Sequence, residues 1–170
     1  MKKAKKVVAS LLAVVSAVSM AACGPKDDPT NSGGTSARDP EKVDAAKTQL
    51  YVGNYYGGLG DTWVYNVKDQ FEAAYANEVF ETGKKGVQVI IVNDKDKYAD
   101  ANLKVNMQNL EEDIIISDGT QLYEMSSYYL DITDIVTEGG DNSIASRINA
   151  SFRDYYKMPG YKYYAVPTYQ

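Results

Sequence analysis

The chain has 170 residues, of which 44% are apolar and 24% are charged. These values are typical of a globular chain with one domain and one core, and they exclude collagen-like and wholly disordered proteins. The sequence has no His and a single Cys, which excludes Ser-His-Asp triads, Cys-His dyads, His-based metal sites and internal disulfides. Composition therefore argues against most hydrolytic enzymes.

The first 22 residues have the pattern of a secretory signal. Met1–Lys6 holds four lysines, and the 16 residues from Val7 to Ala22 are uncharged and mostly apolar. A membrane-spanning helix needs about 20 apolar residues, so this run is short for one. We therefore expect a signal peptide over residues 1–22, with a short anchor helix as the alternative.

The segment Met20-Ala21-Ala22-Cys23 closes this run and resembles the lipobox of bacterial lipoproteins. The resemblance implies cleavage before Cys23 and lipidation of its thiol and its new amino group. A lone Cys is otherwise most often a buried apolar side chain, but Cys23 lies between the signal and a polar segment. Attached acyl chains would hold the protein at the outer face of the cell membrane.

Removal of residues 1–22 makes the chain more acidic. It leaves 14 basic residues against 23 acidic ones, a formal charge of −9. No basic run stands out in the sequence, so nucleic acid is not expected as a partner. The acidic balance is also mild evidence against an anionic ligand.

Residues 23–47 are expected to form a flexible linker that carries the lipid. Gly24–Pro40 is rich in Gly, Pro, Ser, Thr, Asn and Asp and has almost no apolar side chains to bury. Glu41–Lys47 is either a frayed helical turn or more of the linker.

Residues 48–170 alternate between strand and helix patterns. The expected strands are Gln49–Asn54, Val87–Val92, Asp113–Ser117 and a last one from Tyr163 to Pro167. The expected helices are Trp63–Asn77, Ala99–Leu110, a short one from Leu122 to Leu130, and a last one that Asn142 or Ser143 caps and that reaches Phe152. Strands joined by helices predict parallel βαβ units, and the nearly continuous apolar run Val87–Val92 predicts a central strand buried on both faces.

The helix after the first strand predicts which side chains face the core. Its apolar residues recur with the helical period, at Trp63, Val67, Phe71 and Ala74. Trp63 is as suitable for stacking on a ligand as for packing in the core.

Ligands of open α/β sheets bind at the carboxyl ends of the strands, where this chain carries aromatic, amide and carboxylate groups. The candidate ligand-binding residues are Asn54, Tyr55, Tyr56, Asp61, Asp118, Gly119, Tyr169 and Gln170. Tyr rings stack on the apolar faces of sugars, and carboxylates accept hydrogen bonds from sugar hydroxyls. The structural alternatives stay open: Tyr can pack helices onto the sheet, Asp61 can cap a helix, and Asp118 can belong to an Asp-Gly turn.

The order of these segments resembles the start of an extracellular solute-binding protein, the ligand receptor of an ABC importer, of the sugar-binding family. The resemblance depends on the lipobox, the linker, the β-α-β-α-β order, Tyr129-Leu130-Asp131-Ile132-Thr133 and Gly160–Pro167. It implies an α/β fold: the parallel-sheet βαβ lobe of a periplasmic-binding-protein-like type II fold. Members of that family have two lobes and longer chains, so residues 48–170 are expected to form an incomplete first lobe that binds ligand weakly or not at all by itself.

The resemblance also implies the function. The protein would capture a carbohydrate, above all an oligosaccharide, and deliver it to a membrane permease, without enzyme activity, cofactor or metal. The alternatives are a surface lipoprotein enzyme acting on polysaccharide, a receptor for a peptide or another solute, and a structural lipoprotein with no small ligand.

Overall fold

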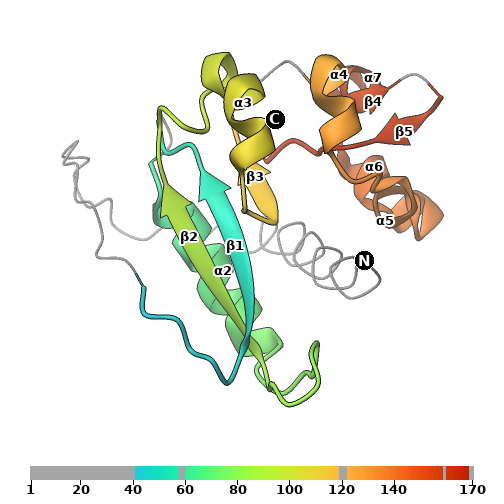
Figure 1. Cartoon of the computed structure of the whole chain (residues 1–170). Helices are drawn as coiled ribbons and strands as arrows, with labels where there is room; N and C mark the ends of the chain where they lie inside the picture. Colours follow the sequence, from blue (N-terminus) through green and yellow to red (C-terminus); the bar gives the residue numbers. More distant parts are fainter. Residues whose placement is uncertain (1–40, 58–59, 119–121, 159, 169–170) are drawn as a thin grey trace, which may run out of the picture. The chain divides into compact units, whose positions relative to one another are not determined.

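The structure is a computed structural model, and it describes residues 41–57, 60–118, 122–158 and 160–168 (Figure 1). The expected signal, Cys23 and most of the expected linker lie outside these residues. Within the described ranges, no helix has the length and apolar character that crossing a bilayer requires.

The chain divides into two compact units, although its length predicted one domain. The first unit takes in the chain up to Lys95 together with Glu111–Ile116, and the second consists of Asp96–Leu110 and Ser117–Gln170. The chain therefore leaves the first unit after its second strand, returns for a third strand, and leaves again.

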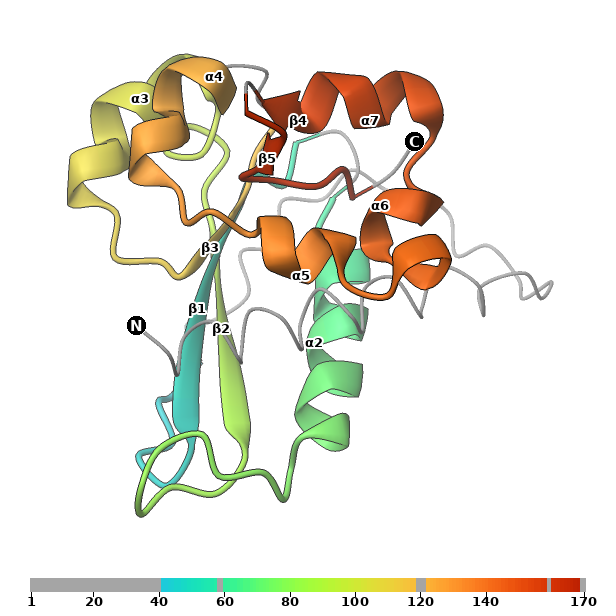
Figure 2. The same cartoon turned by 90° about the vertical axis from the view of Figure 1, so that its right-hand side faces the viewer.

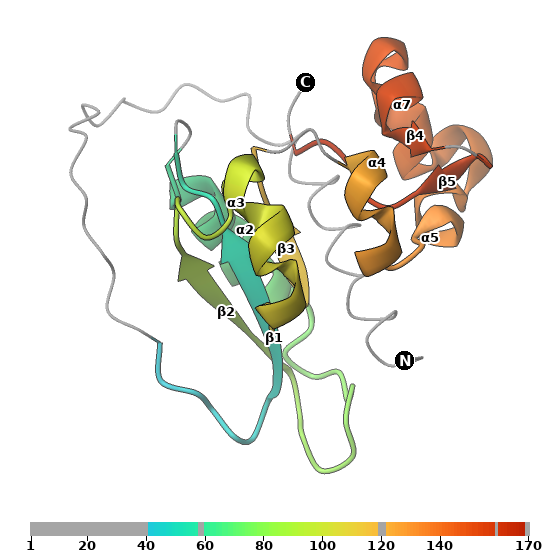
Figure 3. The same ribbon diagram turned by 45° about the horizontal axis from the view of Figure 1, so that its top comes forward.

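The first unit is a parallel sheet with one helix, so the chain is of the mixed α/β class. The strands are β1 (Thr48–Asn54), β2 (Val87–Asn93) and β3 (Ile114–Ile116), and the helix α2 (Thr62–Ala74) joins β1 to β2. Both β2 and β3 pair with β1 in parallel, in the order β2-β1-β3 (Figure 3). The predicted parallel βαβ unit is thus confirmed.

The prediction that Val87–Val92 is the central strand was wrong, because β1 lies between β2 and β3. A continuous apolar run shows that a strand is buried, but it does not show how many neighbours the strand has. The first four residues of β2 are buried and the last three are partly exposed.

Helix α2 lies along the sheet (Figure 2), and its buried apolar side chains are Val64, Val67 and Phe71. Together with Lys68 these residues follow the i, i+3, i+4, i+7 spacing of one helix face. The predicted face was correct at Val67 and Phe71 and wrong at its ends, because Trp63 is only partly buried and Ala74 is exposed.

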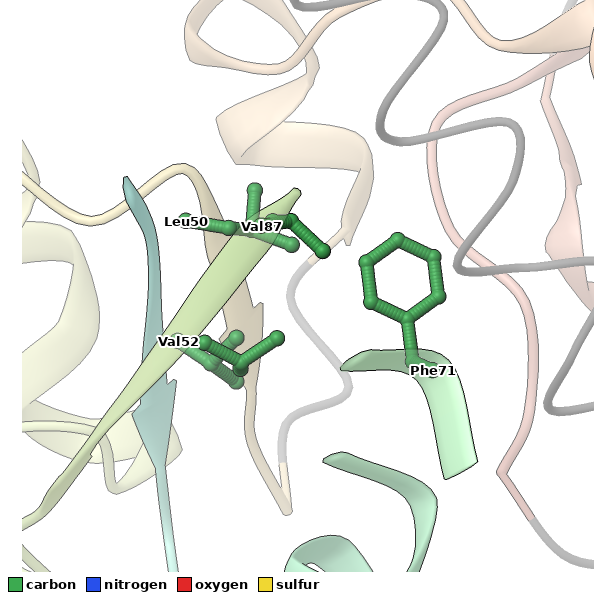
Figure 4. Close-up of a cluster of buried hydrophobic side chains, with 5 residues drawn as sticks. Leu50, Val52, Phe71 and Val87 are labelled. Carbon is green, nitrogen blue, oxygen red and sulfur yellow. The ribbon is translucent and has the colours of Figure 1, made fainter. Parts of the chain in front are cut away.

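The core of the first unit joins the sheet to this helix (Figure 4). Its buried members are Leu50, Val52, Phe71, Val87 and Val89, and Phe71 is fully enclosed. The turn into β2 depends on Gly86, whose φ is +80° and whose added Cβ would lie 3.0 Å from the Ala76 carbonyl oxygen. Only Gly adopts that conformation without strain.

Residues 41–47, expected as linker or as a frayed turn, form a turn that is bonded to the first unit. Gln88 on β2 accepts a hydrogen bond from the Asp44 N–H at 2.7 Å and donates one to the Lys42 carbonyl at 3.0 Å. Lys68 forms an ion pair with Glu41 at 3.1 Å. The folded unit therefore includes these residues, and its boundary lies before residue 48.

The second unit is built from short helices and a two-stranded hairpin. Its helices are α3 (Asp100–Asn106), η1 (Met107–Asn109), α4 (Leu122–Met125), η2 (Ser126–Tyr128), α5 (Thr133–Thr137), η3 (Gly140–Asn142), α6 (Ile144–Arg147) and α7 (Ala150–Tyr156). The hairpin pairs β4 (Lys157–Met158) with β5 (Lys162–Tyr163) in antiparallel fashion. Buried side chains of this unit include Tyr98, Leu103, Met125, Val136 and Ile148.

Two predictions for this unit were wrong. The single helix expected to reach Phe152 is two helices, because Ser143 caps α6 by accepting from Ser146 N–H and Asn149 caps α7 by accepting from Ser151 N–H. The expected strand Tyr163–Pro167 is replaced by the short β5, whose partner is β4 and not the parallel sheet.

Candidate ligand-binding site at the carboxyl edge of the parallel sheet

The carboxyl ends of β1 and β2 carry a pair of asparagines. In the register of the sheet, Asn54 lies opposite Asn93 on one side and opposite Ile116 of β3 on the other. The chain runs from β1 to β2 on one side of β1 and later returns to β3 on the other side. Ligands of open α/β sheets bind at such a reversal of strand order, outside the carboxyl ends of the strands.

Three polar side chains form a hydrogen-bonded row at this edge. Asn54 Nδ2 donates to Asn93 Oδ1 at 2.8 Å, and Asn93 Nδ2 donates to Asp61 Oδ2 at 2.9 Å. All hydrogen bonds of the row run in one direction: each amide nitrogen donates to the next side chain, and the last acceptor is a carboxylate. Backbone bonds fix its position: Asp94 N–H donates to the Asn54 carbonyl at 3.1 Å, and Tyr55 N–H donates to that of Ile116 at 2.9 Å.

The side chain of Asp61 does not cap a helix, which was the structural alternative for this residue. The residue occupies the N-cap position of α2, but its side chain does not bond to the first turn of that helix. Its main-chain oxygen accepts from Tyr65 N–H at 3.3 Å, while its carboxylate accepts from Asn93. The carboxylate is therefore directed to the sheet edge instead of capping the helix.

Asn54 is the most buried member of this row. The residue is fully enclosed, and its Oδ1 atom has no hydrogen-bond partner in the described part of the protein. A buried acceptor without a donor destabilises a protein by about 1–3 kcal/mol. Asn54 Oδ1 is therefore an acceptor of this edge that could still take a hydrogen bond.

The two tyrosines that follow β1 are partly buried. The ring of Tyr55 lies over Gly57, where an added Cβ would come within 2.6 Å of Cζ and Oη of Tyr55. The absence of a side chain at residue 57 thus lets this ring fold back on its own loop. Tyr56 follows it in the same loop.

Asp118 belongs to the second unit, and its carboxylate has a structural partner there. Asp118 Oδ1 accepts from Asp100 N–H at 2.9 Å, at the first residue of α3. An anionic acceptor at a helix start is stabilising because it satisfies a free N–H and complements the helix dipole. Asp118 is thus a helix-capping side chain. The other predicted residues, Gly119, Tyr169, Gln170 and Cys23, lie outside the described residues.

Asn93 is the residue of this edge that the sequence analysis did not identify. It follows the apolar run Val87–Val92 directly, as Asn54 follows the apolar residues of β1. Alignment of the ends of two parallel strands would have placed the two asparagines side by side.

Altered pKa values occur away from this edge. Bonds from the hydroxyl and the N–H of Thr133, with help from Lys162, lower the pKa of Asp131 to about 2. Burial opposes the charge of Lys68, but its bonds to Glu72 and Glu41 outweigh burial and raise the pKa of Lys68 above its ordinary value. Both groups have ion-pair partners, so they have structural roles.

The edge can therefore donate and accept hydrogen bonds with neutral hydroxyl groups, through two amides and one carboxylate. No group of three or more His, Cys, Asp or Glu side chains among the described residues is arranged to hold a metal ion. Comparisons of the chain with protein-family models, with curated proteins and with solved structures found no match.

Proposed function

We propose that the chain is the extracellular solute-binding receptor of an ABC importer, and that it captures a carbohydrate for a membrane permease. The observation that carries the proposal is the row Asn54–Asn93–Asp61 at the carboxyl edge of a parallel sheet, with the buried Asn54 Oδ1 still without a donor. Amides and carboxylates in fixed orientation are the groups that hold sugar hydroxyls, and the Asp61 charge disfavours anionic sugars. The sequence resemblance to the sugar-binding family and the parallel sheet β2-β1-β3 support this proposal, of which a periplasmic-binding-protein-like type II lobe is a part.

A titration of the full-length, 15N-labelled protein tests the proposal. The side-chain amide signals of Asn54 and Asn93 are followed by NMR as maltose, cellobiose or glucuronate is added. NMR detects weak complexes, so weak binding does not hide the result. We expect at least one neutral disaccharide to move both signals and glucuronate to move neither. If no sugar moves them, or glucuronate moves them most, the proposal is wrong.

Thr48 provides a matched control for Asn54. Thr48 Oγ1 is the other buried atom of β1 that lacks a hydrogen-bond partner, and it lies at the opposite end of the same strand. Asn54→Leu should weaken sugar binding about tenfold, because a hydrogen bond and the orientation of Asn93 are lost. Thr48→Val removes a comparable polar atom and should leave sugar binding unchanged.

Attachment to the outer face of the membrane through Cys23 is part of the same proposal. Mass spectrometry of the protein from a bacterial host should show loss of residues 1–22 and addition of acyl chains to Cys23. Cys23→Ser should abolish the acyl mass. An unprocessed chain with a free thiol would contradict this part of the proposal.

A further inference from the structure

Exposed aromatic side chains gather in one segment of the second unit. On α7, Phe152 is 44% exposed and Tyr155 is 49% exposed, and Tyr161 in the loop of the following hairpin is 74% exposed. Phe152 and Tyr155 are three residues apart, so they share one face of the helix. Tyr155 stacks edge to face on Tyr156 with ring centroids 5.3 Å apart. Exposed groups of aromatic rings mark surfaces that meet a partner.

The same segment is basic, although the chain as a whole is acidic. From Arg147 to Lys162 the sequence has four basic residues and one acidic residue, whereas the whole chain has a formal charge of −5. Lys162 is paired with Asp131 at 3.1 Å, so the local excess of positive charge comes from the other three basic residues. Lys157 lies with its ammonium 4.3 Å from the centroid of the Tyr161 ring. The acidic total concealed this local excess of positive charge, which is complementary to an anionic partner.

Tyr161 is held in a conformation that disfavours it. Its φ is +64°, and it is the one residue other than Gly with positive φ among those the structure describes. A bulky side chain in the left-handed region is strained, and here it follows Gly160, whose φ is +81°, in the turn of the hairpin. Gly would relieve the strain, but it would also remove the exposed ring. The hairpin thus exposes the Tyr161 side chain to solvent while the backbone of this residue stays in a strained conformation.

We propose that this face, made of Phe152, Arg153, Tyr155, Lys157 and Tyr161 on α7 and the β4–β5 hairpin, binds anionic lipid headgroups at a membrane surface. Tyr and Phe rings together with long basic side chains are the combination that prefers the boundary between acyl chains and headgroups. Lys157 and Arg153 would contact the phosphates, and the rings would lie at headgroup depth. The contact is separate from the sugar site and does not require lipidation of Cys23.

The test is residue-specific NMR of the full-length protein with bicelles that contain a spin-labelled lipid. Backbone signals of residues 152–157 and 160–162 should broaden with phosphatidylglycerol-containing bicelles, more than the signal of Lys85 in the first unit. Broadening should be weaker with phosphatidylcholine alone and should decrease at high salt. Equal broadening of the Lys85 signal, or no dependence on phosphatidylglycerol, would overturn the proposal.

Variants separate the proposed contact from a structural role. Lys157→Gln should weaken binding to anionic bicelles about fivefold, whereas Lys85→Gln, with the same change of net charge, should not change it. Tyr161→Gly should raise the melting temperature, because it relieves the strained φ, and still weaken binding. A Tyr161→Gly protein that binds as well as the unmodified chain contradicts the proposal. Glycerol 3-phosphate that moves the same signals in the absence of bicelles would assign the face to a soluble phosphate instead.

Discussion

The two units of this chain are stabilised in different ways. The first has a continuous apolar core in which sheet and helix share Leu50, Val52, Phe71, Val87 and Val89. The second has short helices, several of which begin at a polar side-chain contact, and its buried apolar residues are spread over many elements. Loss of apolar contacts should therefore affect the first unit most, and loss of polar contacts should be the characteristic weakness of the second.

The largest expected effect comes from Phe71→Ala in the first unit. Phe71 is fully enclosed between α2 and the sheet, so its loss leaves a cavity and should lower the free energy of unfolding by about 3–5 kcal/mol. Phe152→Ala in the second unit is the matched change at a residue 44% exposed, and it should change stability by less than about 1 kcal/mol. Urea unfolding followed by circular dichroism measures both. Equal losses would mean that the comparison of the two units is wrong.

The next effect concerns the ion pairs of the buried Lys68 in the first unit. Lys68 Nζ contacts Glu72 at 2.5 Å and Glu41 at 3.1 Å, and Glu72 also accepts from Val89 N–H at 2.7 Å. Lys68→Ala leaves two carboxylates without their cation, and because both are partly exposed we expect a loss of about 2 kcal/mol. Glu72→Gln keeps an acceptor for Val89 and should lose less. Denaturant titration measures the stability loss of each variant. A larger loss for Glu72→Gln than for Lys68→Ala would contradict this account.

A smaller effect should appear as a pH dependence of the second unit. The pKa of Asp131 is lowered to about 2 by its bonds from Thr133 and its pairing with Lys162. The folded state thus holds the proton less tightly than the unfolded state. The stabilisation is present above about pH 4 and is lost as the pH falls toward 2.

Asp131→Asn should therefore reduce stability at neutral pH. It should also weaken the dependence of stability on pH between about pH 4 and pH 2. Because the pair is largely exposed, the loss should be below about 1 kcal/mol. Asp134→Asn, on the exposed side of α5, is the control and should leave this pH dependence unchanged. Melting temperatures measured across the acid range provide the comparison.

The smallest expected effect is that of the ion pair between Lys104 on α3 and Glu124 on α4. The bond to Glu124 raises the pKa of Lys104, but both side chains are more than half exposed. Water and salt screen such a pair. Lys104→Gln should therefore produce a shift in melting temperature near the limit of detection. A large shift would show that this contact, and not the buried side chains, holds α3 to α4.

The sequence predicted the strands and helices that depend on a local pattern of residues. The runs at Leu50–Val52 and Val87–Val92 are strands because apolar β-branched residues follow one another there, and α2 begins where its period begins. The order β2-β1-β3 could not be read in that way, because the number of neighbours of a strand depends on residues far away in the chain. In the second unit the break at Ile148 depends on one capping side chain, that of Asn149, within a pattern that continues across it.

The sequence predicted part of the candidate site, namely the residues that stand next to a clear strand or helix. Asn54 and Asp61 stand beside clear elements, so their position at a strand end and a helix start could be foreseen. Their connection through Asn93 depends on the register of two strands, which pattern alone does not provide. Asp118 was correctly placed after β3, but the partner of its carboxylate, α3, lies 18 positions back in the chain.

The strand β2 lies at an edge of the described parallel sheet. An uncovered edge strand offers its free N–H and C=O groups to any other strand and so favours aggregation. On β2 the N–H of Val89 is bonded to the side chain of Glu72, which belongs to α2, while residues 42 and 44 bond to the side chain of Gln88. Helix α2 therefore occupies part of this edge as well as burying the core. A protein cut at residue 48 would free the side chain of Gln88 but would keep the bond between Glu72 and Val89, so this protection against aggregation would persist.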